Sequence, residues 1–193
     1  MRVIKKDLKL KILYSGLFLL IVVFVIYFYK NARENNQNNS DTKTLASNLP
    51  PPGIPPIRFT PTGLREYKSP TYHFSVFYPD DLIVEEYRES GDGMTVTFED
   101  KSGEKSFQIF VFPYIGNQIS KQRFEMDVPS KVMDEPVEVV IDSINATAFW
   151  SRNDIMGEVR EVWFINKGFL YEVTTYRELD DWLANIMKTW IFF

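Results

Sequence analysis

Few side chains in this 193-residue sequence are able to support enzymatic chemistry. His73 is the single histidine and cysteine is absent, so a His-containing metal cluster or a Ser-His-Asp system would have to include His73. This histidine lies within an alternating aromatic run, which favours a structural or half-exposed position on a strand. Without cysteine the chain forms no disulfide, and packing of the core must supply the stability of the fold.

Three acidic pairs could bind Ca²⁺ or act as paired carboxylates: Asp80-Asp81, Glu85-Glu86 and Glu99-Asp100. Their spacing matches no calcium-binding loop, so we interpret them as charges on exposed strands and turns. A fourth pair, Asp180-Asp181, is expected at the amino end of a helix, where negative charge is favourable. The sequence therefore predicts no catalytic residue, no metal site and no cofactor site.

Three further patterns have both a functional and a structural interpretation. Gly91-x-Gly93 lacks the strand-glycine-helix context of a phosphate loop and is interpreted as a turn. Asn145-Ala146-Thr147 fits the glycosylation sequon but lies within a predicted strand, so we interpret the match as chance. Six aromatic side chains at strand spacing could line a ligand groove, although core packing is the favoured interpretation: Phe149, Trp150, Trp163, Phe164, Tyr171 and Tyr176.

The elements that would position these side chains are mostly strands. In Tyr72–Pro79 the aromatic and apolar side chains at 72, 74, 76 and 78 share one face, and proline ends the run. Met94–Glu99 alternates in the same way. Ser106–Phe112 is apolar on both faces at its end, which indicates a strand covered on both sides. The predicted strands are 72–79, 82–88, 94–99, 106–112, 136–142, 144–152, 158–166 and 168–176.

Two helices interrupt this pattern. The segment 119–128 has Ser120 as a good N-cap, with Ile119 and Phe124 at the positions of a hydrophobic staple. The segment 179–190 has apolar residues at helical spacing and acidic residues in its first turn. Short turns join successive strands, so an antiparallel meander is expected rather than a parallel sheet. We therefore predict an α+β fold with an antiparallel sheet of about seven strands flanked by helices.

The amino-terminal part of the chain has a different character. Residues 12–29 form an apolar run without charge or proline, which corresponds to about 27 Å of helix and matches the hydrocarbon core of a bilayer. Five basic residues precede it, which favours a cytoplasmic tail at residues 1–11. A cleaved signal peptide is the main alternative and a buried core helix is another, but the run is long for a signal peptide and no small-x-small cleavage site follows.

Residues 30–68 are interpreted as a linker that holds the following domain, residues 69–193, away from the membrane. Its first part is rich in Asn and its second in Pro, so a flexible segment is followed by a stiff one. Pro52 and Pro55 form a P-x-x-P pattern, which fits a spacer better than a ligand outside the cytoplasm. Beyond residue 30 the net charge is −9, so nucleic acid is not an expected partner.

The run Tyr72–Pro79, followed by Asp80-Asp81-Leu82, resembles the opening of PsbP/Mog1-like domains. The helix running into Thr189–Phe193 resembles the closing helix and last strand of that family, and the resemblance covers about residues 66–193. His73 stands where a glycine is common in the family, and Leu82 where a tryptophan is common. The resemblance implies an α/β/α sandwich around an antiparallel sheet, and it implies accessory, assembly or binding roles rather than an enzymatic activity.

Three functions are compatible with the sequence. The first is a single-pass membrane protein, anchored in the lipid bilayer by residues 12–29, whose extracytoplasmic domain binds a protein partner at the cell envelope without catalysis. The second is a small-ligand or lipid carrier with a pocket between a helix and the aromatic sheet. The third is a hydrolase with an unusual carboxylate site, which would require two acids in one cleft with perturbed pKa values.

Overall fold

A computed structural model describes residues 51–128, 130–153 and 156–193. The chain divides into two compact units, Met1–Asn48 and Leu49–Phe193, and the second contains every element discussed below. The apolar run at 12–29 and the Asn-rich part of the expected linker lie outside the described residues. None of the helices in the described part is long and apolar enough to cross a bilayer.

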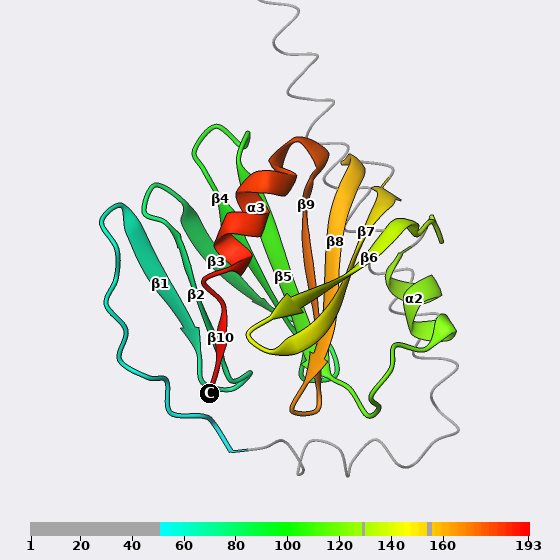
Figure 1. Ribbon diagram of the computed structural model, residues 1–193, viewed down its shortest axis with the longest axis horizontal. Helices are drawn as coiled ribbons and strands as arrows, with labels where there is room; N and C mark the ends of the chain where they lie inside the picture. The colour runs from blue at the N-terminus through cyan, green and yellow to red at the C-terminus, as the bar shows by residue number, and fades with distance from the viewer. Residues whose placement is uncertain (1–50, 129, 154–155) are drawn as a thin grey trace, which may run out of the picture. The chain divides into compact units, whose positions relative to one another are not determined.

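The largest element of the domain is an antiparallel sheet of seven strands, as the sequence predicted (Figure 1). Its spatial order is β3-β4-β5-β9-β8-β7-β6. The strands are β3 (Ile83–Arg88), β4 (Met94–Glu99), β5 (Ser106–Pro113), β6 (Asp134–Ile141), β7 (Ile144–Asn153), β8 (Gly157–Asn166) and β9 (Phe169–Tyr176).

The sheet is not a simple meander. After β5, the chain passes through helix α2 (Lys121–Asp127) to the far edge of the sheet and begins again with β6. It then returns strand by strand until β9 pairs with β5, from Phe107 opposite Thr175 to Pro113 opposite Phe169. Turn chemistry predicted the hairpins within this sheet but not this long connection, because hairpin signals describe only neighbouring strands.

Three strands form a second sheet, ordered β1-β2-β10. They are β1 (Leu64–Ser69), β2 (Phe74–Pro79) and β10 (Ile191–Phe192). The aromatic run at 72–79 therefore belongs to a separate sheet rather than to the large one. Strand β1 begins within the segment that the sequence analysis interpreted as linker, because its sequence LREYKS has few apolar residues and no regular alternation.

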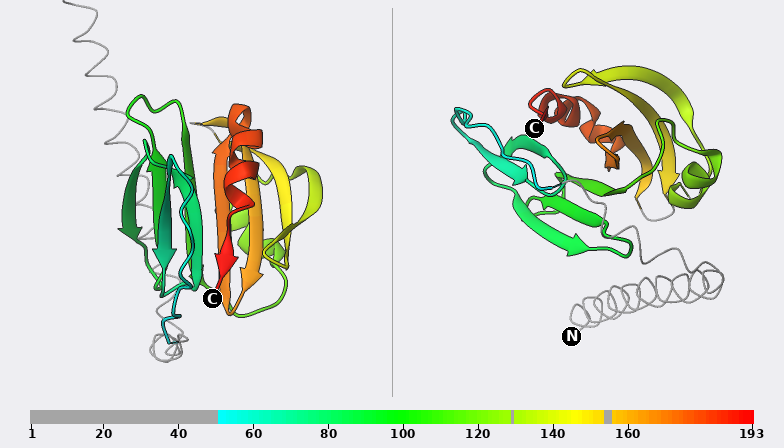
Figure 2. Two further views of the ribbon diagram at one scale, coloured as in Figure 1. Left: turned by 60° about the vertical axis from the view of Figure 1, so that its left-hand side comes forward. Right: turned by 90° about the horizontal axis from the view of Figure 1, so that it is seen from below.

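Both faces of the large sheet are partly covered. The sheet is strongly curved, and its concave face holds the small sheet and helix α3 (Asp180–Met187), while α2 lies on the opposite face (Figure 2). Aromatic rings fill the space between these layers, with Phe98 stacked on Phe107 and Phe74 stacked on Trp190 at centroid distances of 4.3 and 4.4 Å. This arrangement confirms the predicted α+β class, with helices on both faces of an antiparallel sheet.

Both helices begin where the sequence indicated. The Ser120 side chain accepts a hydrogen bond from the Arg123 backbone N–H at 3.1 Å, which caps α2. Ile119 and Phe124 pack against the same small cluster of buried residues, as a hydrophobic staple requires. A short 3₁₀ turn (Arg177–Leu179) leads into α3, whose first turn carries Asp180 and Asp181.

Strand β2 is buried on both faces, although alternation predicted one buried face. Phe74, Val76 and Tyr78 point into the core, as expected. On the other face Arg58 covers the strand: its guanidinium lies 4.0 Å from the centroid of the Phe77 ring and donates to Ser75 Oγ at 3.1 Å. It also donates to the Thr189 carbonyl at 2.7 Å. Part of the expected linker therefore packs on the domain.

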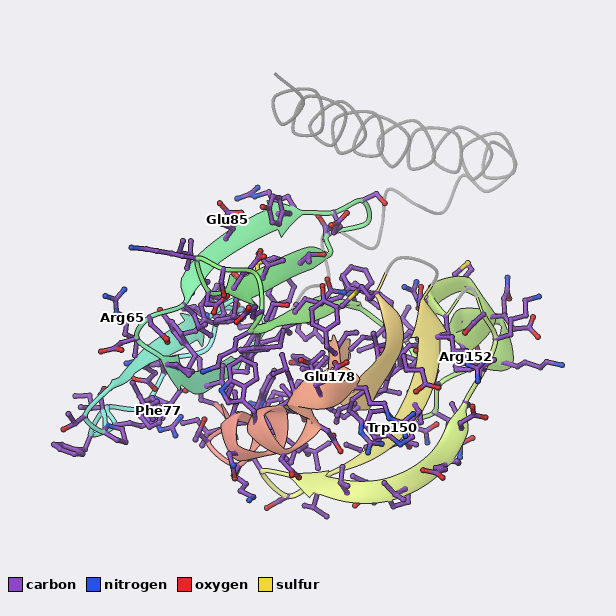
Figure 3. The ribbon with its side chains drawn as sticks, turned by 90° about the horizontal axis from the view of Figure 1, so that it is seen from above. Arg65, Phe77, Glu85, Trp150, Arg152 and Glu178 are labelled. Atoms are coloured by element: carbon purple, nitrogen blue, oxygen red, sulfur yellow. The ribbon has the colours of Figure 1, made fainter. Side chains whose placement is uncertain are left out.

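Replacing Arg58 by alanine should lower the free energy of unfolding by about 1–3 kcal/mol, because a half-buried guanidinium loses several hydrogen bonds and its contact with Phe77. Urea unfolding followed by tryptophan fluorescence measures this change. Arg65→Ala is the matched control, since Arg65 is exposed on β1 (Figure 3), and it should change stability by less than about 0.5 kcal/mol. If both substitutions lower the free energy of unfolding by the same small amount, the contacts of Arg58 do not contribute to the stability of the fold.

Candidate functional site

An apolar groove lies between α3 and the strands β6, β7 and β8, and we call it the α3 groove. It has a volume of about 490 Å³. Figure 3 shows Trp150 on the same side of the sheet as α3. The groove is lined by Val137, Val139, Val140, Ile141, Asp142, Ala148, Arg160, Val162, Asp180, Leu183, Ala184, Met187 and Lys188.

Helix α3 forms one wall of the groove because its apolar residues recur at helical spacing. Leu183, Ile186 and Met187 are buried against the sheets. Ala184, one turn after Asp180, is exposed, and its small side chain leaves space between the helix and the strands. On the sheet side, Ala148 is also small, which deepens the groove at β7.

One end of the groove is closed by a fixed ion pair. Arg160 on β8 donates two hydrogen bonds to the Asp180 carboxylate, at 2.8 and 2.9 Å, and such a bidentate geometry is specific as well as favourable. The same guanidinium lies 3.5 Å from the centroid of the Trp150 ring. The two charges neutralise each other, so this end of the groove presents no unpaired charge to a ligand.

The other end is formed by the β6–β7 turn and the end of α3. Asp142 Oδ2 accepts a hydrogen bond from the backbone N–H of Phe192 at 2.7 Å, which fastens the turn to β10. Lys188 is exposed and donates to Asn185 Oδ1 at 2.9 Å. The groove therefore has an apolar floor and charged ends, but none of its lining residues forms a nucleophile–base pair.

A second, larger groove lies on the opposite face, beside α2, with a volume of about 950 Å³. Its aromatic side chains face away from solvent, since Phe149 and Trp163 are 0% and 2% exposed. These two rings pack against Phe124 of α2 at centroid distances of 5.9 Å. A ligand in this groove would find few aromatic surfaces, so we consider the α3 groove the better candidate site.

Beneath α2 the structure brings together three carboxyl groups that the sequence analysis did not single out. Glu161 on β8 accepts hydrogen bonds from Thr174, Trp163 and Ser151, and its burial raises its pKa. Glu172 on β9 is buried beside Asp127 of α2, and burial raises its pKa to about 10.

Asp127 is held by Arg123, whose Nη2 donates to Oδ1 at 2.7 Å while its guanidinium lies 3.6 Å from the centroid of the Phe112 ring. Burial also raises the pKa of Asp127. Asp127, Glu161 and Glu172 line neither of the two grooves. Glu172 lies against Asp127 and Arg123 of α2, whereas the hydrogen bonds of Glu161 stay within the strands. Among the described residues no group of three or more His, Asp or Glu side chains has the arrangement of a metal site.

The sequence contained one signal for these carboxyls. Glu161 and Glu172 each interrupt an apolar strand, in VREVWF and LYEVTT. A charged residue inside such a strand is either exposed or paired, and only the position of α2 decides between these outcomes.

The acidic pairs that the sequence did single out do not converge. Asp80 and Asp81 are exposed in the β2–β3 turn, and Glu85 and Glu86 are exposed on the edge strand β3. Figure 3 shows Glu85 on this strand. Asp100 accepts hydrogen bonds from Ser102 and from the backbone of its own turn, which lowers its pKa. These placements agree with the interpretation of the pairs as exposed strand and turn charges.

His73 has a structural position. It is buried with φ of +56°, in the left-handed region where glycine is favoured. Its Nδ1 lies 3.1 Å from the Phe193 carbonyl oxygen, and its ring packs near Phe169. Gly91 also has a positive φ and lies in a turn, as expected.

The six candidate aromatic residues are divided between the two faces of the sheet. Phe149, Trp163, Phe164 and Tyr171 are buried, which confirms core packing for these four. Trp150 is half-buried beneath Arg160 and Arg177, and Tyr176 is half-buried at the end of β9. Asn145 of the sequon is exposed at the start of β7, within a strand as predicted.

Comparison with known proteins defines the class of fold. No protein-family model and no curated protein sequence matches the chain. The solution structure of cyanobacterial PsbP (CyanoP) from Synechocystis superposes with a TM-score of 0.50 at 11% identity, covering 73% of this chain and 98% of that one. A GTP binding regulator from Thermotoga maritima covers 58% of this chain and 81% of its own, at 12% identity and a TM-score of 0.32. The domain therefore has a PsbP-like α+β fold.

The proton on Glu172 makes the stability of the domain depend on pH. Between about pH 4.5 and 10 the folded state retains a proton that the unfolded chain releases, so the free energy of unfolding falls as the pH rises. Glu172→Gln keeps the shape without ionising. Between pH 5 and 9, the free energy of unfolding of this variant should fall by about 1–3 kcal/mol less than that of the parent.

Urea unfolding at several pH values measures this difference. Glu104→Gln is the matched control, because Glu104 is exposed in the β4–β5 turn, and it should leave the pH dependence unchanged. A Glu172→Gln variant with the pH dependence of the parent would show that Glu172 is ionised in the folded domain.

Proposed function

We propose that the chain is a single-pass, membrane-anchored extracytoplasmic module that binds a protein partner at the cell envelope without catalysis. The observation that carries this proposal is the α3 groove, which is apolar along its floor and has its Arg160–Asp180 pair already satisfied. Such a surface is suited to holding a partner and contains no reactive group. The fold likeness to CyanoP is compatible with a binding role but does not determine it.

The proposed anchor is the apolar run at residues 12–29, with the basic tail at residues 1–11 in the cytoplasm. The linker then leads to a domain that begins its packing at Gly53, whose backbone N–H donates to the Pro70 carbonyl at 2.8 Å. A tether of this kind raises the effective concentration of the α3 groove near other membrane proteins.

A small-ligand or lipid carrier is the second candidate function. The volume of the α3 groove, about 490 Å³, falls within the range of about 300–1,000 Å³ for small-molecule sites. Protein docking is favoured because one wall of the groove is an edge strand with exposed side chains, Val137 and Val140. A hydrolase is not proposed, because the carboxyls with raised pKa values lie outside both grooves.

The proposed topology predicts the result of proteolysis on intact cells that express the full chain with an epitope inserted in the exposed turn at Lys101. External protease should remove the epitope, whereas an epitope at residue 2 should be protected until the membrane is permeabilised. Protection of both epitopes in intact cells would place the domain inside. A mature chain that starts beyond residue 30 would show that the apolar run is cleaved.

Site-specific photocross-linking tests the α3 groove as the docking surface. A photoreactive residue at exposed Ala184 should give a discrete protein adduct in the native membrane, and one at Lys101 should give none. Mass spectrometry of the adduct distinguishes a protein from a lipid. A lipid adduct at Ala184 would favour the carrier, and equal adducts at both positions would show that the groove is not a specific surface.

A further inference from the structure

The free edge of β6 adds a specific mode of binding to the proposed function, on which the following inference rests. We propose that the α3 groove binds one extended segment of its partner as an additional strand beside β6, and that this segment alternates apolar and basic side chains. Main-chain hydrogen bonds to β6 would hold the segment, and alternate side chains would enter the groove. Three features of the domain support this mode of binding: the open edge of β6, the apolar groove beside it and the acidic residues along β6.

Within the described part of the chain, strand β6 is an edge of the seven-stranded sheet and pairs only with β7 (Figure 1). Asp142 and Ser143 form a two-residue turn with φ of +44° and +71°, so Ile141 and Ile144 beside the turn form a hydrogen-bonded pair. In an antiparallel ladder such pairs alternate with non-bonded ones. The backbone N–H and C=O groups of Glu138 and Val140 are therefore directed away from β7, toward an incoming strand.

Only the first half of this edge is protected against strand addition. Pro136 has no N–H to donate, and the register shifts between Asp134 and Val137, which bends the strand. From Val137 to Ile141 the edge has one charged residue and no proline. The opposite edge, β3, has three charged residues among six, in the sequence IVEEYR, and charges on an edge strand oppose pairing.

Apolar side chains accompany the open half of β6. Val137 and Val140 of this strand are 51% and 66% exposed, which is high for valine side chains. Val139 and Ile141 line the α3 groove opposite Leu183 and Met187. Because the sheet curves around α3 (Figure 2), a strand added beside β6 would direct every second side chain toward this groove.

The charge along β6 identifies the chemistry of the partner. Asp134, Glu135 and Glu138 lie on β6 and Asp142 follows it, with no basic residue between them. Glu138 lines the groove beside α2, so the side chains of the incoming strand that point away from the α3 groove would lie beside it. Of the two basic residues that line the α3 groove, Arg160 is paired with Asp180 and Lys188 lies at the far end of α3. Basic side chains on the incoming strand would complement these acidic residues. A second copy of β6 would instead repeat the same acidic residues, so pairing of two identical edges is disfavoured.

The probe is a nine-residue peptide of alternating Val and Arg with blocked ends, titrated by calorimetry into the full chain in phosphatidylcholine nanodiscs. We expect binding that is at least tenfold tighter than that of the matched Val/Glu peptide. N-methylation of the peptide amides on one alternate set should abolish binding, and methylation of the other set should preserve it, because only one set faces β6.

Val140→Pro removes the outward N–H without removing a hydrogen bond to β7, and it should weaken binding at least tenfold. Val140→Thr keeps the N–H and is the matched control, with an expected change of less than about threefold. The N-methylated peptides test the same hydrogen bonds on the unaltered protein, so the test does not depend on the folding of the proline variant.

Several results would overturn strand addition. Binding that is insensitive to methylation of either set would exclude main-chain pairing. A concentration-dependent dimer that Val140→Pro abolishes would identify a second copy as the occupant of the edge, and binding of a fluorescent fatty acid in place of the peptide would identify a carrier. If the peptide fails to bind while Ala184 still cross-links to a protein, the proposed docking function stands and only the strand mechanism is wrong.

Discussion

The pairing of β10 with β2 is the constraint on which the rest of this domain depends. Ile191 and Phe192 lie opposite Ser75 and Phe74, and the Phe193 N–H donates to the His73 carbonyl at 3.0 Å. Trp190, just before this strand, is stacked on Phe74 and buried, although its Nε1 has no hydrogen-bond partner within the described part of the chain. Burial of the large ring and its aromatic contacts outweigh the loss of one hydrogen bond.

This pairing also determines where α3 lies, because only three residues separate the end of the helix from the start of β10. Its position on the concave face creates the α3 groove on one side and contacts with the small sheet on the other. The opposite face is organised differently, with α2 held over buried carboxyls by Arg123. One face thus leaves apolar surface accessible, while the other uses charge to fasten a short helix.

Local sequence patterns correctly predicted most of the elements, and long-range contacts account for the differences. The alternation in MTVTFE and the cap at Ser120 depend on neighbouring residues, and both agree with the structure. Arg58 could not be assigned to the domain, because its partners Ser75 and Thr189 lie 17 and 131 residues away. The sequence alone did not distinguish Glu172 from an exposed charge on a strand, because α2 covers it only in the folded domain. The α3 groove depends on the crossover between β5 and β6, which no local pattern predicts.

The separation in sequence between paired strands has a consequence for how the domain folds. Strand β10 pairs with β2 across more than 110 residues, and β9 pairs with β5 across more than 50. Before such distant contacts form, the chain must lose conformational entropy without the compensating burial of apolar surface. Folding is therefore expected to be slow, in milliseconds to seconds. Until residues 190–193 are in place, the Phe74 ring lacks its stacked partner Trp190, and the apolar surface left exposed makes newly made chains more prone to aggregation.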